Sequence, residues 1–277
     1  MAARTTTRLG VFSVYCIAVG QALSSAVVSA PPLQLHFHDF WSTERSVAEI
    51  HSHVCDCMGD PATDVDVVSA EPPLVVIHDF LERTMCDDIV HSAQATNGME
   101  RSTTGAKQAT TEGRTSSTVW LKDHECRQPL REMADKVSSL TGLPTAHMEN
   151  LQVVRYEPGQ EFNLHTDHQD YFNDLECRGR LATLLLYLSE PDAGGETWFP
   201  ENDVRIAPKQ GSAVFFWNTK EKPGSDGYHP EVFLNTDQRM RHAGLPVDGG
   251  EKWVCNRWIH PIDFGAGVRG VAKEALV

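Results

Sequence analysis

The second half of the chain is built from short apolar runs that turn residues separate. Each run is five to eight residues long, as strands usually are, and most are rich in β-branched or aromatic residues. The runs are LQVVRY (151–156), LATLLLYL (181–188), SAVFFW (212–217) and KWVCNRWI (252–259). The turn signals between them include Glu157-Pro158-Gly159, Ala193-Gly194-Gly195 and Asp248-Gly249-Gly250. This punctuation predicts a β-sandwich or a double-sheet jelly roll.

Helical periodicity appears earlier, in the stretch that begins at Pro72. LVVIHDFL (74–81) predicts a strand, and residues 82–95 predict a helix with an apolar face. That face consists of Met85, Ile89, Val90 and Ala93. Helices that precede the strands predict an α+β fold in which the helices flank a jelly-roll core.

A second strand and a second helix follow the first pair. STVWL (117–121) predicts the strand, Pro129 opens the helix, and Gly142 ends it. The apolar stripe of this helix is Leu130, Met133, Ala134, Val137 and Leu140. Residues 99–117 between the two helices are mostly polar and contain two glycines, so we expect a mobile loop there.

The N-terminal segment has a different composition from the rest of the chain. Arg4 and Arg8 precede a long uncharged stretch that ends in small residues, a pattern that predicts a signal peptide over residues 1–30. The stretch is also about as long as a bilayer crossing, so an uncleaved signal anchor is the alternative. We expect residues 31–71 to form a linker or extension, residues 72–265 the main domain and residues 266–277 a tail.

Charge and cysteine content narrow the setting in which the protein works. The formal net charge is −14, which argues against a nucleic-acid partner because nucleic-acid binding needs a basic surface. The chain has seven cysteines, of which Cys16 lies in the predicted leader. An even number behind a leader fits an oxidising compartment. We therefore expect the lumen of the endoplasmic reticulum or the secretory pathway, with membrane attachment only through an uncleaved anchor.

The stretch NLHTDH (163–168) contains the candidate chemistry. Side chains two apart on a strand face the same way, so His165 and Asp167 are able to bind one metal ion. A facial iron(II) site needs two histidines and one carboxylate, and His242 on a later strand is the third candidate. Lys252 lies beyond a Gly-Gly turn, and a hairpin would bring it near His242. His168 is expected to point away from Asp167, in an outer layer or at the surface.

Five stretches of the chain, in this order, resemble the catalytic domain of prolyl 4-hydroxylases. These enzymes are iron(II)- and 2-oxoglutarate-dependent dioxygenases. The stretches are RTSS (114–117), LQVVRYEPGQEFNLHTD (151–167), LATLLLYLSEPDAGGETWFP (181–200), IAPKQGSAVFFWN (206–218) and HAGLPVDGGEKWVCNRWI (242–259). The resemblance covers residues 72 to about 262 and implies a double-stranded β-helix core.

The resemblance also implies roles for individual residues. His165, Asp167 and His242 would hold Fe(II), and Lys252 would pair with the far carboxylate of 2-oxoglutarate. The remaining matches are Tyr156 and Thr197, which would hydrogen-bond that carboxylate, Trp258 near the cofactor, and Arg114 and Glu149 facing the peptide. The alternatives without a binding role are core or turn positions for Tyr156 and Thr197 and a solvated loop charge for Arg114.

The implied reaction is 4-hydroxylation of peptidyl proline, with 2-oxoglutarate decarboxylated to succinate. The implied co-substrates are 2-oxoglutarate and O2, with Fe(II) as the metal and ascorbate as the reductant that keeps it active. A proline-rich peptide or protein would be the partner, since such segments adopt the polyproline II form at little entropic cost. The alternatives are a related dioxygenase acting on another residue or a small molecule, and an inactive binding module.

Overall fold

The computed structural model describes residues 47–58, 64–104, 109–122, 126–168, 179–220 and 235–261. The predicted leader and the C-terminal tail lie outside these ranges. Among the described residues, no helix is long and apolar enough to cross a membrane.

The centre of the fold is an antiparallel sheet of eight strands with the order β1-β2-β11-β7-β14-β5-β4-β3. Its strands are β1 (Val65–Ala70), β2 (Pro73–Ile77), β3 (Glu100–Arg101), β4 (Ser117–Leu121), β5 (Leu151–Tyr156), β7 (Ala182–Tyr187), β11 (Ala213–Trp217) and β14 (Lys252–Ile259). The apolar runs recognised in the sequence form the central strands of this sheet.

Two smaller sheets complete the β structure. A four-stranded sheet has the order β10-β9-β12-β6, and β13 pairs with β8. Their strands are β6 (Phe162–His165), β8 (Ala193–Gly194), β9 (Thr197–Phe199), β10 (Val204–Ile206), β12 (His242–Gly244) and β13 (Val247–Gly249). A large and a small sheet in this arrangement form a double-stranded β-helix, as predicted.

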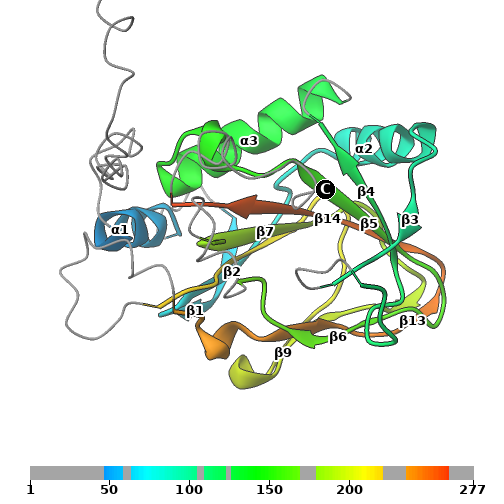
Figure 1. The fold of residues 1–277 in the computed structure, drawn as a ribbon. Helices are drawn as coiled ribbons and strands as arrows, with labels where there is room; N and C mark the ends of the chain where they lie inside the picture. Colours follow the sequence, from blue (N-terminus) through cyan, green and yellow to red (C-terminus); the bar gives the residue numbers. More distant parts are fainter. Residues whose placement is uncertain are drawn as a thin grey trace, which may run out of the picture. The chain divides into compact units, whose positions relative to one another are not determined.

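The three α-helices of the described residues pack against the face of the large sheet that points away from the small sheets. Helices α2 and α3 are seen above the sheet in Figure 1. The helices are α1 (Val47–Met58), α2 (Arg83–Ala95) and α3 (Arg127–Thr141), with 3-10 turns η2 (Thr145–His147), η4 (Pro200–Asn202) and η6 (Gln238–Met240). Helix α3 ends at Gly142, which adopts φ 68°, a left-handed conformation that suits glycine. The predicted helices therefore exist, and α3 begins two residues before Pro129.

Alternation along the strands divides the interior into two apolar clusters. On β14, Cys255 and Ile259 join the cluster under the helices, whereas Val254 joins the cluster between the large and small sheets. The same alternation on β5 sends Val153 towards the helices and Tyr156 between the sheets. The face of the large sheet that points towards the small sheets is therefore the one not covered by helices.

Two segments of the N-terminal half contain regular structure that the sequence did not predict. The linker or extension predicted over residues 31–71 contains α1 and β1, and Val54 of α1 is fully buried in the core. The loop predicted over residues 99–117 instead contains β3, which pairs with β4. Cys86, Cys126 and Cys255 are buried free thiols and do not form disulfides.

The predicted hairpin between His242 and Lys252 is wrong. Strand β12 belongs to the small sheet, while β14 belongs to the large sheet and pairs through Lys252 with Tyr156 of β5. Strand β13 lies between β12 and β14 in the sequence and pairs with β8. The Gly249-Gly250 turn therefore leads from this two-stranded sheet to β14 of the large sheet. The two residues line one cavity between the sheets and are not partners in a ladder.

Candidate metal and dicarboxylate site

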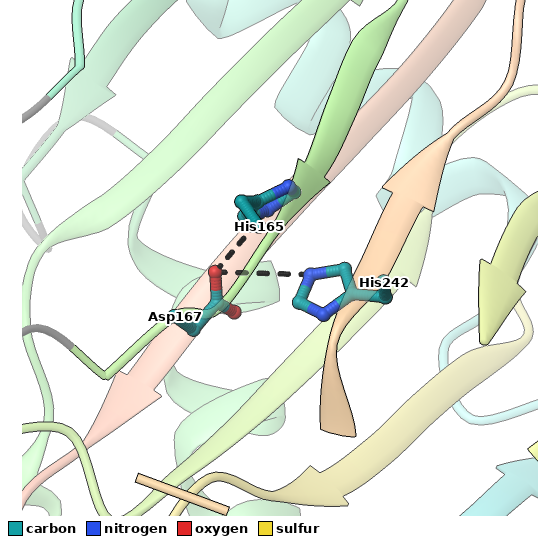
Figure 2. A group of neighbouring side chains, drawn as sticks. All are labelled: His165, Asp167 and His242. Atoms are coloured by element: carbon teal, nitrogen blue, oxygen red, sulfur yellow. Dashed lines mark ion pairs between the residues drawn. The ribbon is translucent and has the colours of Figure 1, made fainter. Parts of the chain in front are cut away.

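Three side chains with metal-ligating atoms meet at one point between the sheets. The ligand atoms of His165, Asp167 and His242 all lie within 4.8 Å of one another (Figure 2). His165 Nε2 is 3.6 Å and His242 Nε2 is 3.8 Å from Asp167 Oδ1. The two histidines are direct cross-strand partners on β6 and β12, so the antiparallel register brings them together. Asp167 follows two residues after the end of β6.

Backbone carbonyls fix the tautomer of both histidines. His165 Nδ1 donates to the Asn163 carbonyl at 2.8 Å, and His242 Nδ1 donates to the Met240 carbonyl at 3.0 Å. Because a carbonyl only accepts, Nδ1 carries the proton and Nε2 keeps its lone pair. Both lone pairs are therefore available on the side where Asp167 lies, as metal ligation requires.

The charge state of the three groups suits a divalent cation. Burial alone would raise the pKa of Asp167, but His242 and His165 outweigh it and hold that pKa well below its usual range. Burial lowers the pKa of His242 to about 4, with a further contribution from His165. An ionised carboxylate and a neutral imidazole are the forms that bind metal. Two histidines and one carboxylate match the donor set of non-haem Fe(II), so the residues fit this metal.

Lys252 lies in the wall of the same cavity, which has a volume of about 770 Å³ and also includes the three ligands. Its side chain is 2% exposed, and Nζ donates to the Gly195 carbonyl at 2.8 Å and lies 4.4 Å from the centre of the Tyr156 ring. No carboxylate among the described residues forms an ion pair with it. A buried ammonium without an anionic partner favours an anionic ligand.

The predicted carboxylate-binding residues line this same part of the cavity. Tyr156 and Thr197 are both buried cavity residues. The hydroxyl of Tyr187 donates to Thr197 Oγ1 at 2.7 Å. Since Thr197 accepts that bond, its own proton is left for another acceptor. Tyr156 also belongs to the apolar cluster between the sheets, so the core alternative stands for it, and the role of both residues in binding 2-oxoglutarate stays a prediction.

Aromatic and cationic side chains also line the cavity. Trp120 and Trp258 have ring centres 5.7 Å apart, and the guanidinium of Arg180 lies 3.4 Å from the centre of a Trp258 ring. Arg114 is 8% exposed and lines the cavity, and Nη2 donates to Gln152 Oε1 at 3.3 Å. Arg114 is thus not a solvated loop charge, and its predicted contact with a peptide is compatible with this position.

Glu149 is placed differently from the prediction. It is buried and absent from the residues that line the cavity. Its carboxylate accepts two bonds from Arg180, at 2.6 and 3.0 Å, and one from His260 Nε2 at 2.8 Å. Arg180 lines the cavity and Glu149 holds it from behind, and the contact of Glu149 with the substrate stays a prediction that its burial does not support.

Two further differences concern residues around the triad. His168 is 1% exposed, so the surface alternative for it is wrong. Thr183 and Asn218, which the sequence analysis did not single out, are buried beside Asp167. Thr183 interrupts the apolar LATLLLYL run, and a polar residue inside an apolar strand is a signal by which a buried partner could have been found.

The jelly-roll core, the triad and the buried lysine define an iron-dependent oxygenase that takes a dicarboxylate co-substrate. The family model of the 2OG-Fe(II) oxygenase superfamily matches residues 151–260. Among curated proteins, prolyl 4-hydroxylase 5 of Arabidopsis thaliana is 33% identical over 221 residues, 72% of each chain. The prolyl 4-hydroxylase subunit alpha-1 of Gallus gallus is 36% identical over 159 residues, 56% of this chain and 28% of that subunit.

A solved structure agrees with these relatives. The viral collagen prolyl hydroxylase of Paramecium Bursaria Chlorella virus-1, in complex with 2-oxoglutarate, is 30% identical and superposes with a TM-score of 0.53. The match covers 68% of this chain and 95% of the viral one. The chain belongs to the prolyl 4-hydroxylase family of 2-oxoglutarate-dependent dioxygenases. It uses Fe(II), 2-oxoglutarate and O2.

Proposed function

We propose that this enzyme hydroxylates C4 of proline residues in proline-rich segments of proteins that pass through the secretory pathway. The observation that carries the proposal is the placement of Lys252 and the triad in one cavity, which Trp120 and Trp258 also line. One region suits a small dicarboxylate, and another offers rings and hydrogen-bonding groups to an extended peptide.

The residues have distinct tasks in this reaction. The ammonium of Lys252 binds the far carboxylate of 2-oxoglutarate, with Tyr156 and Thr197 as neutral hydrogen-bonding groups beside it. His165, Asp167 and His242 hold Fe(II) by three ligands and leave three positions open. Bound iron supplies the oxidation, in which O2 converts 2-oxoglutarate to succinate and CO2 and places a hydroxyl on the proline.

The protein contributes position and a dry environment. A substrate held within contact distance of the metal reacts as part of one complex, and the entropy of bringing the partners together is lost in binding. Trp120 offers a flat apolar face for a pyrrolidine ring, and Arg114 offers hydrogen-bond donors to peptide carbonyls. Polyproline II segments suit such a wall because they are extended before binding.

Mass spectrometry of reacted peptides tests the proposed substrate. The full chain is incubated with Fe(II), 2-oxoglutarate, ascorbate and either polyproline or a matched peptide in which alanine replaces proline. We expect one oxygen atom per hydroxylated proline, located at C4, and succinate release that depends on the proline peptide. Succinate release that is equal with both peptides would contradict a proline substrate, and His242→Ala serves as the inactive control.

The secretory location has its own support and its own test. The basic start, apolar centre and small residues of segment 1–30 favour a signal peptide or anchor. Ascorbate, as the reductant for iron oxidised in unproductive turnovers, is part of the same proposal. Protection of the expressed protein from added protease in sealed microsomes, and its loss on detergent treatment, is the expected result. Digestion without detergent would contradict a luminal site.

A further inference from the structure

The carboxylate of Asp167 uses its two oxygens differently. Oδ1 lies towards Nε2 of His165 and His242, at 3.6 and 3.8 Å. Oδ2 accepts a bond from Thr183 Oγ1 at 2.7 Å and a second from Trp258 Nε1 at 3.1 Å. A carboxylate oxygen with two donors has little capacity for a third partner. Asp167 therefore presents one oxygen, and not two, to the point where the ligands meet.

The proton of the Thr183 hydroxyl is directed by a third residue. Thr183 is 0% exposed, and Asn218 Nδ2 donates to its Oγ1 at 2.9 Å. A hydroxyl has a single proton, and its lone pairs accept from donors such as the Asn218 amide. With Asn218 donating to the oxygen, the proton of Thr183 goes to Asp167, and the bond gains strength from the negative charge of the carboxylate.

Asn218 is itself held by the backbone on both sides. Its N–H donates to the Leu181 carbonyl at 2.8 Å, and its carbonyl accepts from the Asp237 N–H at 2.9 Å. Asp237 is the N-cap of η6, and the Met240 carbonyl at the end of η6 accepts the proton of His242 Nδ1. Asn218 thus connects to two ligands, to Asp167 through Thr183 and to His242 through η6.

We propose that Thr183 and Asn218 are positioning residues of the metal site, which hold Asp167 as a ligand through Oδ1 alone. An aspartate that bound through both oxygens would occupy a fourth position. A facial triad must leave three positions open for the co-substrate and O2. The inference rests on the metal site of the family and is independent of which peptide the enzyme hydroxylates.

Titration of the metal-free full chain with Co(II), under nitrogen and without 2-oxoglutarate or peptide, tests the proposal. Thr183→Val keeps the shape and removes the hydroxyl, whereas Thr183→Ser keeps the hydroxyl. We expect Thr183→Val to weaken Co(II) binding about 10- to 100-fold, as loss of a partner of a metal ligand generally does. We expect Thr183→Ser to stay within about threefold of the parent, because the hydroxyl that bonds the carboxylate is retained. The visible Co(II) spectrum should change in Thr183→Val and stay as in the parent in Thr183→Ser.

Thr141→Val is the matched control, because Thr141 also buries a bonded hydroxyl, which donates to the Val137 carbonyl at 2.8 Å on α3. It should lose thermal stability without a change in Co(II) affinity. Parent-like affinity and spectrum in Thr183→Val would overturn the proposal, and so would equal losses in the Ser and Val variants. If Thr183→Val does not fold, Asn218→Leu decides: weaker Co(II) binding supports the proposal, and unchanged binding overturns it. Because no peptide is present, failure of the proposed substrate leaves this result unaffected.

Discussion

The ammonium of Lys252 donates a hydrogen bond of 2.8 Å to the carbonyl oxygen of Gly195, on the loop between β8 and β9. The lysine is held in place before any anion arrives, and its hydrogen-bond acceptor is a neutral carbonyl. Gly195 has φ +76°, and a Cβ there would lie 3.2 Å from Lys252 Cδ. The glycine therefore allows the backbone to approach the lysine, and the carbonyl is a weak enough partner for a carboxylate to join or replace.

The binding of 2-oxoglutarate should depend on the charge of Lys252. Burial lowers the pKa of Lys252 to about 8, and Glu196 partly offsets the effect. A lowered pKa means that the free enzyme loses the charge as the pH rises through about 8. Since only the ammonium pairs with a carboxylate, the KM for 2-oxoglutarate should be flat below that pH and rise about tenfold per unit well above it.

Steady-state kinetics across this range, with kcat measured separately, checks the pH prediction. Lys252→Arg keeps its charge at every pH used, so a steep rise of KM in that variant would assign the effect to another group. A parent enzyme whose KM does not change with pH would contradict a role for the lysine charge.

Tyr187 should support co-substrate binding through Thr197. Tyr187→Phe removes the hydroxyl that donates to Thr197 Oγ1 at 2.7 Å, and the threonine proton is then no longer directed. Loss of one such bond generally corresponds to about 1 kcal/mol. We expect the KM for 2-oxoglutarate to rise about fivefold with little change in kcat.

A double-mutant cycle with Thr197→Val separates this effect from general loosening of the core. If the tyrosine acts through the threonine, the two changes are not additive. Additive losses in the double variant would assign Tyr187 an independent role.

Metal binding should stabilise the fold through the triad. A metal that binds only the folded state adds about 2.7 kcal/mol at a free concentration one hundred times its Kd. Mn(II) should therefore raise the Tm of the parent chain and leave the Tm of His242→Ala unchanged. His91→Ala, which alters an exposed histidine on α2, is the control and should keep the shift. A shift retained in His242→Ala would place the metal elsewhere.

The Glu149–Arg180 pair should be essential for stability and sensitive to acid. Burial alone would raise the pKa of Glu149, but Arg180 and His260 lower it to about 2. A lowered pKa gives stability that is complete above about 4.5, the unfolded value, and is lost as the pH falls through about 2. Glu149→Gln should reduce the free energy of unfolding at neutral pH by about 3 kcal/mol, because Arg180 stays buried without its partner.

Denaturant unfolding of both proteins at several pH values measures this difference. The gap between parent and Glu149→Gln should narrow as the pH falls below about 4.5, since the carboxyl group of the unfolded parent then takes up a proton that the folded parent binds only near pH 2. A gap that is constant down to the acid limit would show that the carboxylate charge contributes nothing.

Strand and helix assignments followed from local patterns, which is why they were predictable. STVWL and KWVCNRWI are strands β4 and β14 with the predicted bounds. The elements within the linker or extension predicted over residues 31–71 had no local signal, because β1 gains its partner from β2 and α1 packs through side chains such as Val54. Short segments of mixed polarity become ordered through tertiary contacts that no local period reveals.

The difference between local patterns, which the sequence reveals, and tertiary contacts, which it does not, also applies to the site. His165, Asp167 and His242 were identified from the residue types that iron needs and from family resemblance, and the structure brings them together. The position of Glu149 behind Arg180 was missed, since a buried ion pair between residues 31 apart in the sequence has no periodic signature. The Gly249-Gly250 turn looked like a hairpin because sequence gives turn propensity, whereas the pairing partners of a strand depend on the whole sheet.

Strand β14 serves the catalytic cavity and the hydrophobic interior at once. Lys252, Asn256 and Trp258 line the cavity, while Cys255 and Ile259 belong to the cluster beneath the helices. Deleting or inserting a single amino acid within this strand would exchange the two sets, forcing a charged amine against apolar helices and a thiol into the reaction space. Strand β14 can therefore change by substitution only, because an insertion or deletion within it would remove activity and folding together.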